Sequence, residues 1–112
     1  MTWSLFLDDI RDPSYVGDGC DYFLARTFDQ AIKLCEEKGM PSHISFDHDL
    51  GDFVNGVELT GYDFAKWLVE QDLDGLRPLP EDFTWYVHSS NPVGKKNIDH
   101  RLSSYLEYKK TQ

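Results

Sequence analysis

Four short apolar runs predict the strands of a sheet: residues 3–7, 22–25, 44–46 and 83–87. They contain many aromatic and β-branched residues, which strands favour. The first run has no alternation of polar and apolar residues, as is typical of a strand that is covered on both of its faces. We therefore expect a mostly parallel sheet with helices on both faces.

Three further segments have the apolar spacing and the end signals of helices. The first begins at Thr27 and stops before Gly39, and the second begins at Thr60. Each of these threonines is followed three residues later by a residue suited to a capping box. The third helix begins after Asn91, which suits an N-cap, and Pro92 suits its first turn. These are the best-defined elements of the chain.

The remaining segments are turns and loops. Residues 9–21 contain an Asp-Pro pair, further aspartates and two glycines, which is the composition of a loop. The pair Asn55-Gly56, flanked by valines within residues 52–59, predicts a small hairpin that could act as a flap. The order of elements predicts a small three-layer α/β domain of the flavodoxin-like or receiver-like type, with four strands in the order 2-1-3-4.

Composition limits the class of protein further. With 112 residues, 40% of them hydrophobic, we expect a single domain spanning residues 1–112. The formal net charge of −9 argues against broad binding to duplex DNA, which depends on Lys and Arg. No apolar run approaches the roughly 20 residues that span a bilayer, and the N-terminus does not resemble a signal peptide. We therefore expect a cytoplasmic protein that does not bind membranes.

Acidic residues follow two of the predicted strands. Asp8 and Asp9 come directly after the first strand, and Asp47 and Asp49 after the third. Ligands of open α/β sheets bind at the carboxyl ends of the strands, so these side chains can share one pocket. Carboxylate oxygens are the ligands that Mg²⁺ prefers, and Mn²⁺ accepts them as well. A single aspartate here is more often a turn former, but the set predicts a site for a divalent cation.

Two histidines are candidates for acid-base chemistry. His88 ends the fourth strand directly before two serines and a helix start. His48 lies between Asp47 and Asp49 and, if the strand continues, points away from them. A packed, hydrogen-bonded role for His48 is therefore as plausible as a catalytic one. His88 is the stronger candidate.

The start of the third helix is a candidate anion site. Free N–H groups and the helix dipole attract anions there, and Ser89, Asn91, Gly94 and Lys95 lie in or beside it. A helix that is merely well capped has the same residues, and the spacing is not that of a P-loop. Arg11 can clamp a phosphate or pair with a neighbouring aspartate, and we favour the clamp slightly.

Three motifs occur in order along the chain: Leu5-Phe6-Leu7-Asp8-Asp9, Ser45-Phe46-Asp47-His48-Asp49-Leu50-Gly51 and His88-Ser89-Ser90-Asn91-Pro92-Val93-Gly94. Together they resemble the motifs of the cyclic-phosphate processing receiver-like domains, which are common in bacteria and phages. The resemblance runs from Leu5 to about Tyr105 and depends on the combination of the motifs.

The resemblance also implies roles for individual residues. In the related receiver domains an acidic pair binds Mg²⁺, an aspartate accepts phosphate and a Ser or Thr contacts it. Asp8, Asp9, Asp47 and Ser89 take those positions, with Asp49 as the alternative phosphate acceptor. The chain departs from receivers in three ways: a loop replaces the first helix, the fifth strand and helix are absent, and the receiver lysine has no counterpart.

The activity implied by the resemblance is the processing of cyclic phosphates, such as the 2′,3′-cyclic ends of cleaved RNA. Our first hypothesis is a metal-dependent phosphoesterase, a hydrolase in which Asp8, Asp9 and Asp47 hold Mg²⁺ or Mn²⁺. In this form Ser89, Lys95 and helix N–H groups hold the phosphate, and His88 protonates the leaving oxygen. A metal-free form would use His48 and His88 as base and acid. The alternatives are a phosphoacceptor module and a non-catalytic module that binds a cyclic nucleotide or a host protein. A phage-encoded protein would act in the host cytoplasm.

Overall fold

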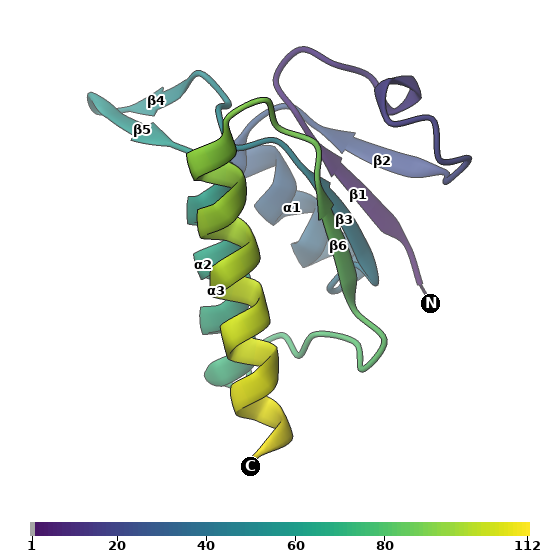
Figure 1. The fold of residues 1–112 in the computed structure, drawn as a ribbon, viewed down its shortest axis with the longest axis vertical. Helices are drawn as coiled ribbons and strands as arrows, with labels where there is room; N and C mark the ends of the chain where they lie inside the picture. The colour runs from purple at the N-terminus through teal and green to yellow at the C-terminus, as the bar shows by residue number, and fades with distance from the viewer. Residues whose placement is uncertain (1) are drawn as a thin grey trace.

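A four-stranded parallel sheet forms the centre of the computed structural model, which describes residues 2–112 (Figure 1). Its strands are β1 (Ser4–Leu7), β2 (Tyr22–Ala25), β3 (His43–Phe46) and β6 (Thr84–Val87). They lie in the order β2-β1-β3-β6, and every neighbouring pair is parallel. The predicted receiver-like sheet is therefore confirmed, with β6 as the predicted fourth strand.

Three helices begin at the predicted residues: α1 (Phe28–Lys38), α2 (Gly61–Leu73) and α3 (Pro92–Lys110). Thr60 and Asp63 form a complete capping box at the start of α2. Asn91 accepts a hydrogen bond from the backbone N–H of Gly94 and so caps α3. These caps satisfy N–H groups that have no partner within the helix.

All three helices cover one face of the sheet, which corrects the prediction of helices on both faces (Figure 1). Alternate strand residues enter one apolar core with side chains from every helix: Leu5, Leu7, Ile44, Phe46 and Val87 with Ala31, Cys35, Phe64, Leu68, Ile98 and Leu102. The connections from β2 to β3 and from β3 to β6 cross the sheet in the same direction, so right-handed crossovers place α1 and α2 on the same face. α3 packs against α2.

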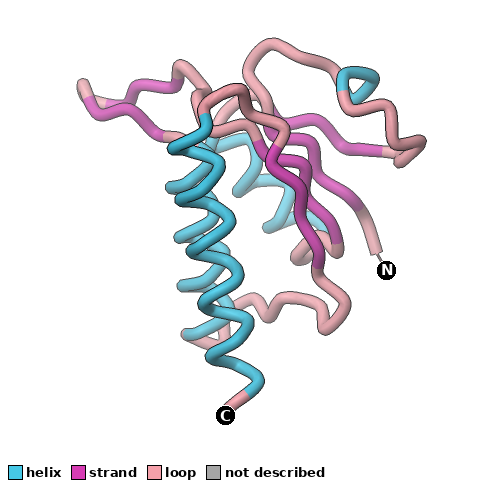
Figure 2. Tube along the Cα trace, in the orientation of Figure 1, coloured by secondary structure: helices cyan, strands magenta, loops and turns pink. Residues whose placement is uncertain are grey.

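The opposite face is covered in part by residues 9–21, which contain a short 3-10 helix, η1 (Pro13–Tyr15) (Figure 2). The connection from β1 to β2 crosses the sheet in the reverse direction, so the same handedness rule directs it to this face. Because a loop takes the place of a helix, this face is thinly covered. The exposed fraction of Tyr86, which lies on it, is 52%.

The predicted hairpin consists of β4 (Asp52–Val54) and β5 (Val57–Leu59), and it projects from the carboxyl end of the sheet (Figure 1). Asn55 and Gly56 have φ angles of 53° and 78°, as the predicted turn requires. The Asp52 carboxylate accepts a hydrogen bond of 3.0 Å from the backbone N–H of Phe28, which ties the hairpin to α1. Within residues 2–112, no helix combines the length and the apolar character that crossing a membrane requires.

Candidate functional site

The register of the sheet brings the first residues after three strands to the same level. Leu7 pairs with Phe46, and Phe46 pairs with Val87. The backbone pairing continues one residue further, because Asp47 N donates to Leu7 O at 2.8 Å and His88 N donates to Phe46 O at 2.9 Å. Asp8, Asp47 and His88 therefore lie side by side, and strand alternation directs them to the face opposite the helices.

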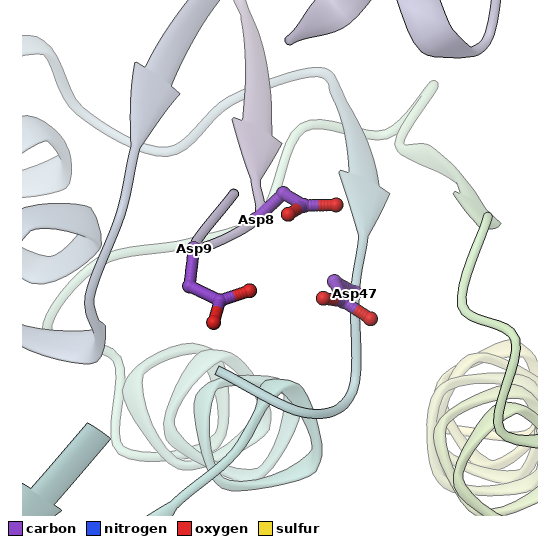
Figure 3. A group of neighbouring side chains, drawn as sticks. All are labelled: Asp8, Asp9 and Asp47. Atoms are coloured by element: carbon purple, nitrogen blue, oxygen red, sulfur yellow. The ribbon is translucent and has the colours of Figure 1, made fainter. Parts of the chain in front are cut away.

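Three carboxylates converge at this edge. Asp8, Asp9 and Asp47 each offer an oxygen, and these oxygens all lie within 4.8 Å of one another (Figure 3). Asp8 and Asp47 are buried and Asp9 is half-buried. A set made only of oxygen ligands fits a hard divalent cation such as Mg²⁺, which uses a few carboxylates and leaves its other positions to water or substrate. Asp49 lies outside this group of three.

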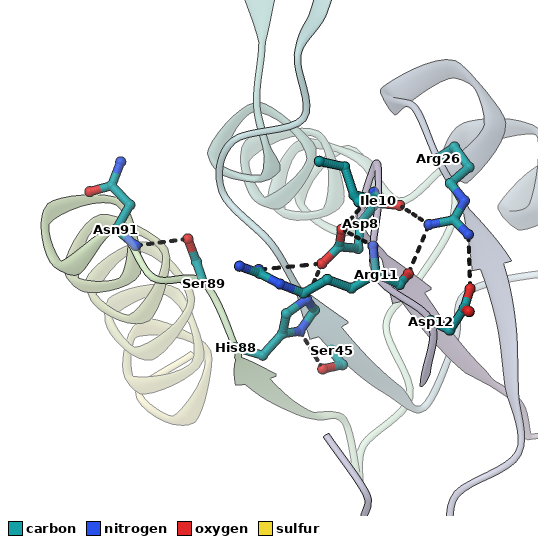
Figure 4. Close-up of polar contacts among 9 residues, drawn as sticks. All are labelled: Asp8, Ile10, Arg11, Asp12, Arg26, Ser45, His88, Ser89 and Asn91. Atoms are coloured by element: carbon teal, nitrogen blue, oxygen red, sulfur yellow. Dashed lines mark hydrogen bonds and ion pairs between the residues drawn. The ribbon is translucent and has the colours of Figure 1, made fainter. Parts of the chain in front are cut away.

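The carboxylate of Asp8 is held by four groups (Figure 4). Its Oδ1 accepts hydrogen bonds of 2.8 Å from the backbone N–H groups of Ile10 and Arg11. Its Oδ2 lies 2.8 Å from His88 Nε2 and 3.7 Å from the Arg11 guanidinium. Burial by itself would raise the pKa of Asp8, but these hydrogen bonds outweigh it and lower the pKa. Asp8 is therefore ionised in the folded protein.

Asp47 has the opposite electrostatic environment. Burial and the negative charge of Asp8 raise the pKa of Asp47, against the opposing effects of the Ser89 hydroxyl, His88 and Arg11. The folded protein therefore holds a carboxylate that it does not stabilise well by itself. Such a raised pKa is common at functional sites and is relieved when a cation binds.

His88 is enclosed rather than open to the pocket. Its side chain is 1% exposed and stacks on the ring of Phe6 with the centroids 4.6 Å apart. Nδ1 lies 2.7 Å from Ser45 Oγ, and Nε2 is hydrogen-bonded to Asp8 (Figure 4). Both ring nitrogens thus have partners in the protein, and the geometry makes His88 a residue that orients Asp8.

His48, Asp49 and Asn91 form a separate network beside the carboxylates. His48 Nδ1 lies 2.9 Å from Asp49 Oδ1, and Asn91 Nδ2 donates to Asp49 Oδ2 at 3.1 Å. These hydrogen bonds, chiefly the one to His48, lower the pKa of Asp49. A Cβ atom on Gly94 would lie 2.3 Å from His48 Cγ, so the imidazole packs directly against the start of α3. The network connects the loop after β3 to that helix.

A pocket of about 460 Å³ contains the converging carboxylates. It is lined by Asp8, Asp9, Ile10, Arg11, Asp47, Asp49, Gly51, Glu58 and Ser90. Arg11 is the one basic residue of this lining. Of the predicted phosphate ligands, Arg11 lines this pocket, whereas Asn91, Gly94 and Lys95 do not. The side chain of Asn91 caps α3 by accepting a hydrogen bond from the N–H of Gly94, and Lys95 lies over the ring of Tyr86 at 5.7 Å.

Sequence reasoning missed three residues of this region. Glu58 reaches the pocket from the predicted hairpin, in which the sequence indicated no site residue. Ser45, a buried strand residue on the same face as Asp47, holds His88. Arg26 donates to the backbone oxygens of Asp8 and Arg11 at 3.3 and 2.8 Å and so anchors the loop after β1 (Figure 4). A serine within the apolar run 44–46 was the one available signal of a buried polar contact.

Comparison with known proteins gives one match. The family described as "Cyclic-phosphate processing Receiver domain" matches residues 3–104 of the 112-residue chain. No curated protein and no solved structure matches the chain. The matched range includes all four strands of the sheet and the three converging carboxylates.

Proposed function

Because this chain belongs to the cyclic-phosphate processing receiver domain family, we propose that it is a phosphoesterase that opens cyclic phosphates on a nucleotide or an RNA end. The observation that carries the proposal is the convergence of the Asp8, Asp9 and Asp47 oxygens within 4.8 Å in a pocket. Three carboxylates alone repel an anionic phosphate, so the proposal includes a divalent cation, Mg²⁺ or Mn²⁺, between them.

The proposed reaction adds one water molecule to the cyclic phosphate. A new P–O bond forms to the water oxygen, one P–O bond to the ribose breaks, and the product is a phosphomonoester with a free ribose hydroxyl. When bound, the cation would offset the charge on the phosphoryl oxygens and lower the pKa of water. Asp8 and Asp9 would hold the cation, and Arg11 and the hydroxyls of Ser89 and Ser90 would orient the phosphate.

Asp47 and His88 have distinct roles in this proposal. Asp47 would help to hold the cation and would take the proton of the attacking water, while solvent protonates the leaving ribose oxygen. His88 would act as a positioning residue, because its Nε2 fixes the carboxylate of Asp8. The metal-free pairing of His48 with His88 is less well supported, since neither histidine lines the acidic pocket.

The test measures turnover of the four nucleoside 2′,3′-cyclic phosphates and of a short RNA with a 2′,3′-cyclic end, with Mg²⁺, Mn²⁺ or EDTA. We expect turnover that requires the cation and that is lost in Asp47→Asn and Asp8→Asn. Asp29→Asn is the control, because Asp29 is exposed and pairs with Lys33 on α1. Activity that survives excess EDTA would overturn the metal-dependent form, and no turnover of any substrate would overturn the phosphoesterase.

A phosphoacceptor module is the second candidate, favoured by the Ser89 hydroxyl beside Asp47. In this case Asp47 would be phosphorylated by a small phosphodonor, as in receiver domains. Incubation with acetyl phosphate and Mg²⁺, followed by measurement of the intact mass, tests it. A phosphate added to the unmodified protein but not to Asp47→Asn would support the phosphoacceptor module. An unchanged mass would exclude the phosphoacceptor module. Binding of cyclic nucleotides without turnover would instead indicate a non-catalytic module for a nucleotide or a host protein.

A further inference from the structure

A second cavity, of about 670 Å³, lies on the face of the sheet that the helices do not cover. It opens between the loop after β1 and the strands β3 and β6, and it is lined by Tyr15, Val16, Asp18, His43, Tyr86 and His88. Strand alternation places His43 and Tyr86 on the same face as the acidic residues at the strand ends. Of this lining, the proposed reaction involves only His88, and it leaves the space of the cavity itself unused.

Its lining differs in chemistry from that of the acidic pocket. It includes neither Lys nor Arg, and its one carboxylate is Asp18, so it does not suit a phosphate. The exposed fractions of Tyr15 and Tyr86 are 55% and 52%, although both are large aromatic residues. Burial lowers the pKa of His43, which therefore has a neutral imidazole at neutral pH. Flat, uncharged ligands with hydrogen-bond donors suit such a lining.

Two direct contacts join this cavity to the acidic pocket, of which Figure 4 shows the one between His88 and Asp8. His88 lines the cavity, and its Nε2 lies 2.8 Å from Oδ2 of Asp8, which lines the acidic pocket. The Arg11 guanidinium lies 4.5 Å from the ring centroid of Tyr15, and these two residues line the acidic pocket and the cavity respectively. Only the thickness of single side chains therefore separates the two spaces.

From this arrangement we infer that the cavity binds the base of a nucleotide whose cyclic phosphate lies at Asp8, Asp9 and Asp47, an inference that rests on the proposed function. Tyr15 and Tyr86 supply aromatic surface on which a base stacks. The ribose then passes over Arg11 and His88. The preferred substrate is a nucleotide or a terminal nucleotide of single-stranded RNA, not a cyclic phosphate without a base.

Asp18 gives the cavity a preference among bases. Its Oδ1 accepts a hydrogen bond of 3.1 Å from Cys20 N, and its Oδ2 accepts one of 2.6 Å from the Tyr22 hydroxyl. The Cys20 side chain is a third partner, and because an ionised carboxylate can accept about four hydrogen bonds, Asp18 retains one site. An exocyclic amino group can donate to such a site, whereas uracil lacks one. We therefore expect cytosine, adenine and guanine to be preferred over uracil.

The experiment compares three ligands: cytidine 2′,3′-cyclic phosphate, uridine 2′,3′-cyclic phosphate and a methyl riboside 2′,3′-cyclic phosphate that lacks a base. Binding is followed by changes in amide NMR signals, and turnover is measured in parallel with Mg²⁺. Since base stacking on an aromatic ring strengthens binding roughly five- to hundredfold, Tyr86→Ala should weaken binding of the cytidine compound by about tenfold. It should not change the response to the base-free compound.

Two further variants sharpen the comparison. Asp18→Asn should reduce the preference for the cytidine over the uridine compound. Tyr108→Ala is the matched control, because Tyr108 is a half-exposed tyrosine on α3 that lines neither the cavity nor the acidic pocket. It should bind and turn over all three ligands like the unmodified protein.

The outcomes separate this inference from the proposed function. If the base-free compound binds and reacts as well as the cytidine compound, or if Tyr86→Ala affects both equally, the base site is wrong while the phosphoesterase stands. If the cytidine compound shifts signals of Tyr15 and Tyr86 but is never hydrolysed, the base site stands and the phosphoesterase is wrong. If nucleotides shift no signal at this cavity, the base site is also wrong.

Discussion

Replacing Asp47 by Asn should stabilise the protein in the absence of metal ions while removing its response to them. Asp47 is 6% exposed and lies beside the ionised Asp8, and both burial and this charge raise the pKa of Asp47. Asparagine has nearly the same shape, carries no charge and can donate a hydrogen bond to Asp8. The variant therefore removes a repulsion without creating a cavity.

The size of the effect follows from the separation of the carboxylates. The oxygens of Asp8 and Asp47 lie within 4.8 Å of each other, and two unit charges at that limit repel by about 3.5 kcal/mol at an effective dielectric constant of about 20. Arg11, His88 and Ser89 offset part of this repulsion. We expect a net gain of about 1–2 kcal/mol in the free energy of unfolding, or roughly 4–8 °C in Tm for a domain of this size.

The pH dependence of this gain has a definite sign. The pKa of Asp47 is raised in the folded protein above its ordinary value of 3.8. Above the folded pKa, the unmodified protein bears the full destabilisation from the ionised carboxylate. As the pH falls through the folded pKa, Asp47 takes up a proton and the destabilisation declines, and below 3.8 it is gone. The advantage of Asp47→Asn should therefore be complete above the folded pKa of Asp47 and vanish below pH 3.8.

Thermal and urea unfolding in EDTA and in increasing Mn²⁺ would measure both effects. The unmodified protein should gain stability with Mn²⁺ by mass action, and Asp47→Asn should not. Asp29→Asn is again the matched control, since Asp29 and its partner Lys33 form an exposed ion pair on a helix, which contributes little to stability. If Asp47→Asn unfolds more easily than the unmodified protein in EDTA, the carboxylates are a structural network and the electrostatic reasoning is refuted.

Three further predictions concern the surroundings of the site. The pKa of Asp8 is lowered in the folded protein, so ionised Asp8 should stabilise the fold above pH 3.8, and this stabilisation should be lost as the pH falls through the folded pKa. Urea unfolding at a series of pH values should show this loss for the unmodified protein but not for Asp8→Asn. An equal loss of stability in acid for both proteins would contradict the reasoning. Gly94→Ala should destabilise the protein by about 1–3 kcal/mol, because the new Cβ meets the His48 ring. In a double-mutant cycle, His48→Ala should recover part of this loss, and additive effects of the two substitutions would exclude the clash. Thr60→Ala should cost about 1 kcal/mol in chemical unfolding through loss of the α2 cap, and no change would show the capping box to be dispensable.

Local elements of this protein were predictable because their signals are local. Thr60 and Asn91 begin helices where the pattern placed them, and Asn55-Gly56 forms the predicted turn. The order of the strands was predictable too, because short right-handed connections leave few alternatives. The same rule also requires the helices to share one face, although the apolar runs by themselves favour strands covered by helices on both sides. The buried residue Phe6 is instead covered by other side chains, among them Tyr22 and His88.

The sequence also predicted that Asp8, Asp9, Asp47 and Asp49 share one pocket, because the carboxyl ends of parallel strands meet at one edge, and all four line the acidic pocket. It could not place the side chains around them. His88 is enclosed between Phe6 and Ser45 and does not line the acidic pocket. Glu58 reaches that pocket from a hairpin. Such placements depend on packing between residues far apart in the chain, which periodicity and spacing do not report. The sequence alone thus determined the secondary-structure elements, their order and the edge of the sheet at which the carboxylates meet. Only the tertiary structure decided which polar groups face the acidic pocket and which are hydrogen-bonded within the protein to support it.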